Sequence, residues 1–274
     1  LDVRATSDGI LVVHHDAVLP DGRPIADLAH HEVPISVPRL EAAFGVMAGM
    51  GVNVEIKNSP AEPGWDPTGE LASATVELIA EVAAGLEILV SCFDLATLDH
   101  VRAVAPHLST GYLVLSAEEP VDAVAAAVAS GCVAVNPWDP CVSSESIARA
   151  HDAGLAVNVW TVDDPDRIRQ LAEWGADAVI VQGGEGGGHT GPVATPLLLP
   201  SVLDAVDIPV IAAGGFFFTA FFFFGSIGAA LAAGMRRGGL LIALVTLPLY
   251  VPTMIFGAAG LYAAASGGEW AAPL

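Results

Sequence analysis

The sequence predicts an α/β protein, an incomplete or rearranged (β/α)8 (TIM) barrel followed by a hairpin of two transmembrane helices. Short apolar segments alternate with amphipathic segments of about ten to fifteen residues, which is typical of a parallel sheet with helices between its strands. The large number of such units favours a barrel over an open sheet. Beyond residue 215 only Arg236, Arg237 and Glu269 are charged, which indicates a segment in a membrane.

The chain opens with an expected hairpin over residues 1–16, because Asp8-Gly9 stands between two apolar strands. Residues 17–36 and 58–69 are expected to be loops. The expected helices are 38–50, 70–84, 95–105, 119–130, 143–153 and 164–174. The expected strands after the hairpin are 51–56, 87–93, 109–115, 132–136, 155–161, 177–182 and 208–213. We hypothesise that strand 208–213 lies beside the Asp2 strand and closes the ring.

We therefore divide the chain into a barrel domain, residues 1–215, and a transmembrane hairpin, residues 216–274. Residues 216–233 and 240–265 contain no charged side chain, and about twenty apolar residues span a bilayer. Two buried core helices are the alternative. The mean hydropathy of the chain, +0.59, favours the membrane. We therefore expect the membrane to be a partner of the protein, bound through residues 216–265.

The net charge of −21 argues against nucleic acid as a partner, because a phosphate backbone is bound through Lys and Arg. The acidity is concentrated in residues 1–215, where 8 positive and 30 negative side chains leave a charge of −22. Lys57 is the only lysine in the sequence.

Candidate chemistry lies at the ends of the first strands. Asp2 and Glu55 offer the hard oxygen ligands that Mg²⁺ or Ca²⁺ prefers, and His15 can transfer protons near neutral pH. Each residue alone has a plainer interpretation. Glu55 and Lys57 could be a surface pair, and Trp160 a core residue.

The ordered set of motifs resembles the glycerophosphodiester phosphodiesterases. The motifs are D-V-R-x-T-x-D-G-x-L-V-V-x-H-D at the start, V-P-R-L-E at 37–41, E-I-K at 55–57, S-C-F-D at 91–94, V-N-P at 135–137 and V-W-T-V at 159–162. The resemblance covers about residues 1–180. It implies a (β/α)8 barrel that hydrolyses a small phosphodiester to glycerol 3-phosphate and an alcohol, with a divalent cation, Mg or Ca.

The resemblance also implies roles for individual residues. Asp2 and Glu55 would be metal ligands, and His15 one of two catalytic histidines. Lys57 would contact the phosphate, and Trp160 would form a wall of the substrate site.

Two parts of the family pattern are not matched. The chain begins one residue after the position of the family's first metal-ligand Glu, and the His-Arg-Gly with the other catalytic His has no counterpart. We therefore expect either a fragment or a protein with half of its catalytic set, and impaired hydrolysis.

The glycine-rich run ADAVIVQGGEGGGHTG at 176–191, with LLLPSVLDAVDIPVIAAGG at 197–215, resembles the nitronate monooxygenases, which are flavin-dependent barrels. Glycine-rich turns bind phosphate through exposed backbone N–H groups. This resemblance implies an alternative FMN site, with His189 near the flavin and the phosphate held by Gly184, Gly187, Gly188, Gly214 and Gly215.

From about residue 225 the sequence resembles the membrane subunit of the bacterial haem exporter used in cytochrome c maturation. This implies a membrane anchor, in the bacterial inner membrane. The positive-inside tendency would place Arg236 and Arg237 in the cytoplasm and the barrel outside, whereas no export signal is visible, so the side of the barrel stays open.

Three partial resemblances stand end to end, which indicates a chimeric, mis-assembled or artificially generated sequence. The first functional hypothesis is an impaired metal-dependent glycerophosphodiester phosphodiesterase. The alternatives are an FMN-dependent, nitronate monooxygenase-like oxidoreductase and a catalytically dead, membrane-anchored barrel.

Overall fold

The computed structural model describes residues 1–47, 49–115, 120–184, 187–188 and 190–213. Contacts within the chain divide it into two units, Leu1–Gly215 and Phe216–Leu274, and the described residues all belong to the first unit. The predicted transmembrane segments, 216–233 and 240–265, lie outside the described residues. Within the described ranges, no helix combines the length and the apolar character that a membrane crossing requires.

The first unit is built on one sheet. Its nine strands are β1 (Asp2–Ala5), β2 (Leu11–Val13), β3 (Gly51–Ile56), β4 (Glu87–Cys92), β5 (Ser109–Val114), β6 (Ala134–Pro137), β7 (Ala156–Val159), β8 (Ala178–Gln182) and β9 (Val210–Ala213). Their order across the sheet is β2-β1-β3-β4-β5-β6-β7-β8-β9. Strand β2 pairs with β1 in the antiparallel sense, and every other neighbouring pair in this part of the chain is parallel.

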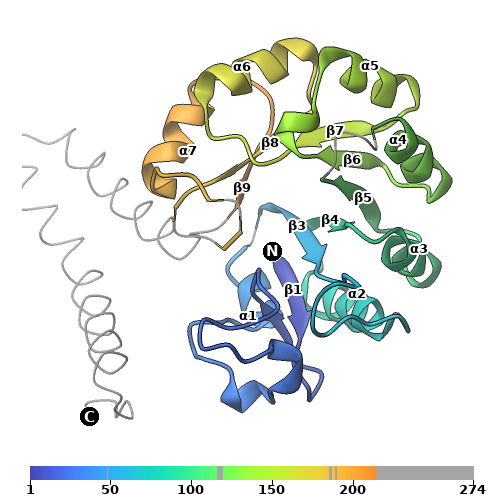
Figure 1. Ribbon diagram of the computed structural model, residues 1–274, viewed down its shortest axis with the longest axis vertical. Helices are drawn as coiled ribbons and strands as arrows, with labels where there is room; N and C mark the ends of the chain where they lie inside the picture. The colour runs from blue at the N-terminus through green and yellow to red at the C-terminus, as the bar shows by residue number, and fades with distance from the viewer. Residues whose placement is uncertain (48, 116–119, 185–186, 189, 214–274) are drawn as a thin grey trace, which may run out of the picture. The chain divides into compact units, whose positions relative to one another are not determined.

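Seven α-helices accompany the described strands and lie outside the curve of the sheet (Figure 1). They are α1 (Leu40–Phe44), α2 (Glu70–Val82), α3 (Leu95–Val104), α4 (Pro120–Ala129), α5 (Ser144–Asp152), α6 (Pro165–Trp174) and α7 (Thr195–Leu203). Strands and helices alternate from β3 to β9, and the sequence predicts this alternation as far as β8. The arrangement is an incomplete barrel of the TIM type.

The alternation of side chains along β3 separates the helix side of the sheet from the interior of the curve. Val52, Val54 and Ile56 are buried, while Asn53 and Glu55 between them point to the other face. Because neighbouring parallel strands keep the same orientation in register, the interior side chains of β1 and β3 meet side by side.

Ring closure by strand 208–213 is not found in the described residues. Strand β9 pairs with β8, and the sheet ends there. Strand β1 already has neighbours on both sides, because β2 pairs with Val3–Ala5 and β3 pairs with Asp2–Val3. Strand β2 therefore occupies the edge of β1 that β9 would need in order to close the ring.

Two elements differ from the expectation. Helix α1 is short, because Gly45 follows it directly and Gly49 adopts a positive φ of 77°. Helix α7 was not expected, since Pro200 lies inside it. Elsewhere the ends are set by local chemistry. The carboxylate of Asp164 caps α6, Pro165 begins it, and Gly175 ends it in the left-handed conformation.

Candidate functional site

The predicted metal ligands lie side by side at the junction of β1 and β3. Asp2 is the register partner of Glu55, and Lys57 follows β3 on the same face. The ammonium Nζ of Lys57 lies 2.6 Å from Oε1 of Glu55 and 3.7 Å from Oδ1 of Asp2. The side chains are 10% exposed for Lys57, 15% for Glu55 and 32% for Asp2, so the cluster is largely buried but reachable.

The two carboxyl groups differ in acidity. Burial raises the pKa of Glu55 above its ordinary value, and the neighbouring charge of Asp2 adds to this, so that the attraction of Lys57 does not restore it. Burial also disfavours the charged form of Asp2, but Lys57 and the other positive groups nearby outweigh it and lower the pKa of Asp2. The pair therefore holds its proton preferentially on Glu55.

His15 lies just beyond the hairpin and is held next to Asp2 through the main chain. The N–H of His14 donates to the carbonyl oxygen of Asp2 at 2.9 Å. Nδ1 of His15 lies 2.7 Å from Oδ1 of Asp16, and this hydrogen bond lowers the pKa of Asp16. The contact leaves Nε2 as the ring nitrogen that can take part in proton transfer.

Trp160 brings three of the sequence motifs together. Its indole Nε1 donates to the carbonyl oxygen of Asn136 at 2.7 Å, and its ring meets Phe93 edge-on with 5.7 Å between centroids. Asn136 in turn accepts a hydrogen bond from Asn158 at 2.9 Å. Phe93, Asn136 and Trp160 come from the S-C-F-D, V-N-P and V-W-T-V motifs and lie at the ends of β4, β6 and β7. Active sites of such barrels form at this end of the strands.

The glycine-rich loop after β8 lies against His15. A Cβ atom added to Gly187 would stand 2.8 Å from Cβ of His15, and one added to Gly188 would stand 2.6 Å from its Nε2. Gly188 also has a positive φ of 81°. Of the predicted FMN residues, Gly184 is described as well, whereas His189, Gly214 and Gly215 lie outside the described residues. The FMN site stays a prediction.

Sequence reasoning missed Arg4 and Glu62. Arg4 lies on the same face of β1 as Asp2, is 6% exposed and forms an ion pair of 2.8 Å with Glu62 from the loop after β3. Its Nε and Nη2 atoms also donate to the carbonyl oxygen of His15, at 3.0 and 2.6 Å. The signal in the sequence was a cation two residues from Asp2, on the face that the carboxylate occupies.

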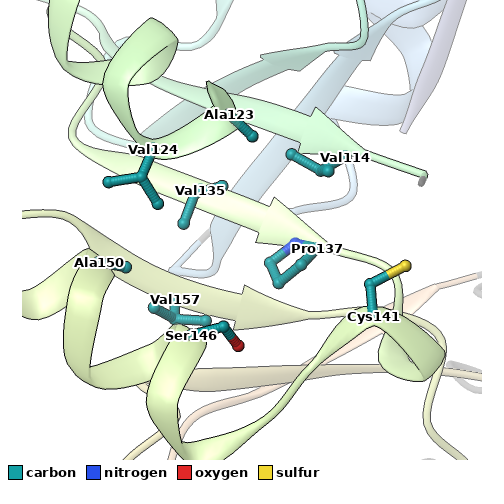
Figure 2. Close-up of a pocket in the computed structure, with 9 residues that line it drawn as sticks. All are labelled: Val114, Ala123, Val124, Val135, Pro137, Cys141, Ser146, Ala150 and Val157. Atoms are coloured by element: carbon teal, nitrogen blue, oxygen red, sulfur yellow. The ribbon is translucent and has the colours of Figure 1, made fainter. Parts of the chain in front are cut away.

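A cavity between the sheet and its helices lies elsewhere. It has a volume of about 30 Å³ and lies on the helix side of the sheet, between β5–β7 and helices α4 and α5 (Figure 2). Its walls are mostly apolar, with Cys141 and Ser146 as the exceptions. It is therefore a gap in the packing, and none of the residues that line it belongs to the cluster of Asp2, Glu55 and Lys57.

Asp2 and Glu55 remain a pair. The described part of the chain contains no group of three or more His, Cys, Asp or Glu side chains that could hold a metal ion. Two adjacent carboxylates still suit a hard divalent cation, because Mg²⁺ is commonly held by one or two carboxylates, with water and substrate phosphate completing its shell.

Residues 1–182 match the glycerophosphoryl diester phosphodiesterase family. The chain belongs to this family. A crystal structure of a candidate glycerophosphoryl diester phosphodiesterase from Silicibacter pomeroyi superposes with a TM-score of 0.59 and 26% identity, over 66% of this chain and 78% of that one. The fold is shared with an Oleispira antarctica phosphodiesterase solved with its product sn-glycerol-3-phosphate (TM-score 0.57, 23% identity, 66% of this chain and 78% of that one).

The phosphodiesterase family match ends before the end of the chain. Residues 196–274 match the CcmB protein family, and Heme exporter protein B of Paracoccus denitrificans is 56% identical over 45 residues, 16% of this chain and 21% of the exporter. The phosphodiesterase segment is thus joined to one from a haem exporter family.

A third kind of relative also matches. The 5-hydroxy-7a-methyl-1-oxo-octahydro-1H-indene-4-carboxyl-CoA dehydrogenase of Rhodococcus jostii is 66% identical over 70 residues, 26% of this chain and 20% of that protein. A candidate monooxygenase of Mycobacterium tuberculosis is 46% identical over 68 residues, 24% of this chain and 17% of that protein. The chain therefore spans only about a fifth of the length of each. The combination of segments is consistent with a chimeric sequence.

Proposed function

We propose that the chain hydrolyses glycerophosphodiesters to glycerol 3-phosphate and an alcohol. The observation that carries the proposal is the meeting of Asp2, Glu55 and Lys57 at the ends of β1 and β3, in a chain of the phosphodiesterase family. Membership of the family supports the reaction class. The geometry supports the roles of the individual residues.

Asp2 and Glu55 would hold a divalent cation, Mg²⁺ or Ca²⁺. When bound, such a cation polarises the phosphodiester and stabilises the charge that develops in the transition state. Binding requires Glu55 in its ionised form, against the raised pKa that burial gives it. Lys57 must then share its ammonium between these carboxylates and the phosphate of the substrate.

Lys57, His15 and Trp160 would act on the substrate directly. The ammonium of Lys57, the only lysine in the sequence, would neutralise the phosphate. His15, with Nδ1 held by Asp16, would exchange a proton with the reacting oxygen through Nε2. The ring of Trp160, fixed through Asn136 and Phe93, would form an apolar wall for the alcohol.

We expect turnover of this polypeptide to be slow. The sequence provides a counterpart for one of the two catalytic histidines that the family resemblance implies. A positioned acid–base group contributes about 10² to 10⁴-fold to a rate.

We further propose that residues 216–265 place the protein in a membrane, the inner membrane of a bacterium. The match of residues 196–274 to a haem exporter family supports this, together with the two uncharged apolar runs. The phosphodiesterase segment, residues 1–215, would then be a membrane-anchored domain.

The identity of the product tests the proposed reaction. Full-length protein in detergent is incubated with glycerophosphocholine and Mg²⁺ or Ca²⁺, and the reaction is followed by ³¹P NMR. We expect the signal of glycerol 3-phosphate to appear. Release of phosphocholine would contradict the proposal, because the other ester bond would have been cleaved.

A further inference from the structure

Arg4 is a buried cation whose hydrogen bonds are directed mainly at the main chain. Its side chain is almost completely enclosed, on the face of β1 that also carries Asp2. Burying a charge costs free energy unless hydrogen bonds compensate it. The partners of Arg4 therefore indicate which part of the fold requires it.

The partners are one carbonyl and one carboxylate. Nε and Nη2 of Arg4 both donate to the carbonyl oxygen of His15, at 3.0 and 2.6 Å. Nη2 also meets Oε2 of Glu62 at 2.8 Å, and the Glu62 side chain is 42% exposed. Two of the three contacts thus hold the backbone of the proposed proton-transfer residue, and a partly solvated carboxylate balances the charge.

His15 is restrained on its other sides as well. The N–H of His14 is bound to the carbonyl of Asp2, and Nδ1 of His15 is bound to Asp16. Gly188 leaves just enough room for the imidazole, because a Cβ atom there would lie 2.6 Å from Nε2, and a Cβ atom on Gly187 would lie 2.8 Å from Cβ of His15. Removing the hold of Arg4 would release the carbonyl of His15, while the ring would keep only its local contacts.

We propose that Arg4 is a positioning residue for His15. It fixes the backbone from which the imidazole projects, and it acts on the substrate only through His15. The proposal rests on the phosphodiesterase function for its kinetic readout, although its structural readout is independent of that function.

The test replaces Arg4 by Met, which keeps much of the length and removes all donors. Because misplacing a reacting group by about 1 Å can cost about 10²-fold, we expect kcat of Arg4→Met to fall by about 10²-fold with KM little changed. Arg4→Lys keeps the charge opposite Glu62 but cannot give two N–H groups to one carbonyl, so we expect an intermediate kcat. Arg23→Met, the same change at an exposed arginine, is the matched control and should behave as the parent.

The structural readout is the rate at which diethylpyrocarbonate modifies each histidine in the full-length protein, followed by peptide mass spectrometry. We expect His15 to react faster in Arg4→Met, and His151, which is bound to Asp177 far along the chain, to react as before. Unchanged kcat and unchanged His15 reactivity would overturn the proposal. A rise in KM without a fall in kcat would also overturn it, because it would indicate direct contact with the substrate.

The two readouts separate failure of the proposal from failure of the proposed function. If the parent shows no turnover but His15 becomes more reactive in Arg4→Met, the positioning role stands and the phosphodiesterase function fails. If His151 also reacts faster than in the parent, the Arg4→Met variant is unfolded, and the Arg4→Lys variant then decides whether Arg4 positions His15. A folded Arg4→Lys with reduced kcat supports positioning, whereas parental kcat and parental His15 reactivity would overturn it.

Discussion

Nζ of Lys57 lies 2.6 Å from Oε1 of Glu55, in a cluster that also includes Asp2. One ammonium therefore faces two carboxyl groups whose acidities move in opposite directions, since the pKa of Glu55 is raised and that of Asp2 is lowered. This arrangement links the protonation of Glu55 to every ligand that the cluster could bind.

Metal binding should weaken as the pH falls. The pKa of Glu55 is raised above the ordinary 4.5, so a cation must displace its proton over the range between 4.5 and the raised pKa. Titration with Mn²⁺, followed by electron paramagnetic resonance, should show affinity increasing with pH through this range. Glu55→Gln should bind weakly at every pH. The same parental affinity at all pH values would contradict the raised pKa of Glu55.

Replacing Lys57 by Met should destabilise the fold at neutral pH. Two largely buried carboxyl groups would lose their cation, and breaking a buried pair by removing one partner costs about 3 kcal/mol or more. Without Lys57 the pKa of Glu55 lies further above its unfolded value, because burial still raises it and the largest influence that lowers it is gone. The contribution of Glu55 to stability is then fully present below the unfolded pKa and is lost as the pH rises through the folded pKa. Thermal unfolding, monitored by tryptophan fluorescence, should show a larger deficit at pH 7 than at pH 4, whereas an equal deficit would argue against the carboxylates as its cause.

Asp66 should stabilise the loop that carries the chain from Lys57 into α2. Burial alone would raise the pKa of Asp66, but its hydrogen bonds from Thr68 and the N–H of Leu71 lower the pKa below 3.8. Its contribution is thus present above 3.8 and is lost as the pH falls through the lowered pKa. Asp66→Ala should cost about 1 kcal/mol at pH 7 and little in strong acid. The exposed Asp207→Ala is the control, and a similar loss in both variants would refute the role.

Much of the fold follows from the sequence, because strand and helix periodicities are local. The strand that carries Glu55 and the helix capped by Asp164 are found within a residue or two of their expected bounds. Helix α7 was missed because Pro200 masks its pattern. The hypothesis that β9 closes the ring is wrong for the described residues, because β2 occupies the edge of β1. The sequence pattern of each strand alone does not show which strand takes that edge.

The sequence predicts the residue types of the site, but not the contacts that hold those residues in place. Asp2, Glu55 and Lys57 meet as neighbouring strands require. The hold of Arg4 on the carbonyl of His15 depends on the course of the backbone after the hairpin, which no spacing encodes. Likewise, the glycine loop suggested phosphate binding, whereas the structure places Gly188 against a residue far earlier in the chain.

The flavin alternative has a direct optical test. Full-length protein is incubated with FMN, freed of excess by gel filtration, and its visible absorption is recorded. We expect no retained flavin, because Gly187 and Gly188 face His15. A flavin band that co-elutes with the protein would favour the oxidoreductase alternative. Gly188→Ala, in which the added Cβ meets His15, would then show whether this loop holds the flavin.

The most direct test of the account is metal-dependent turnover of glycerophosphocholine by the full-length protein in detergent. Mg²⁺, Ca²⁺ and EDTA are compared for the parent, for Glu55→Gln and for Glu77→Gln, a matched change on the exposed face of α2. The account predicts slow hydrolysis that requires the cation, is lost in Glu55→Gln and is kept in Glu77→Gln. Hydrolysis that continues in EDTA or in Glu55→Gln, or its absence from the parent under every condition, would contradict it.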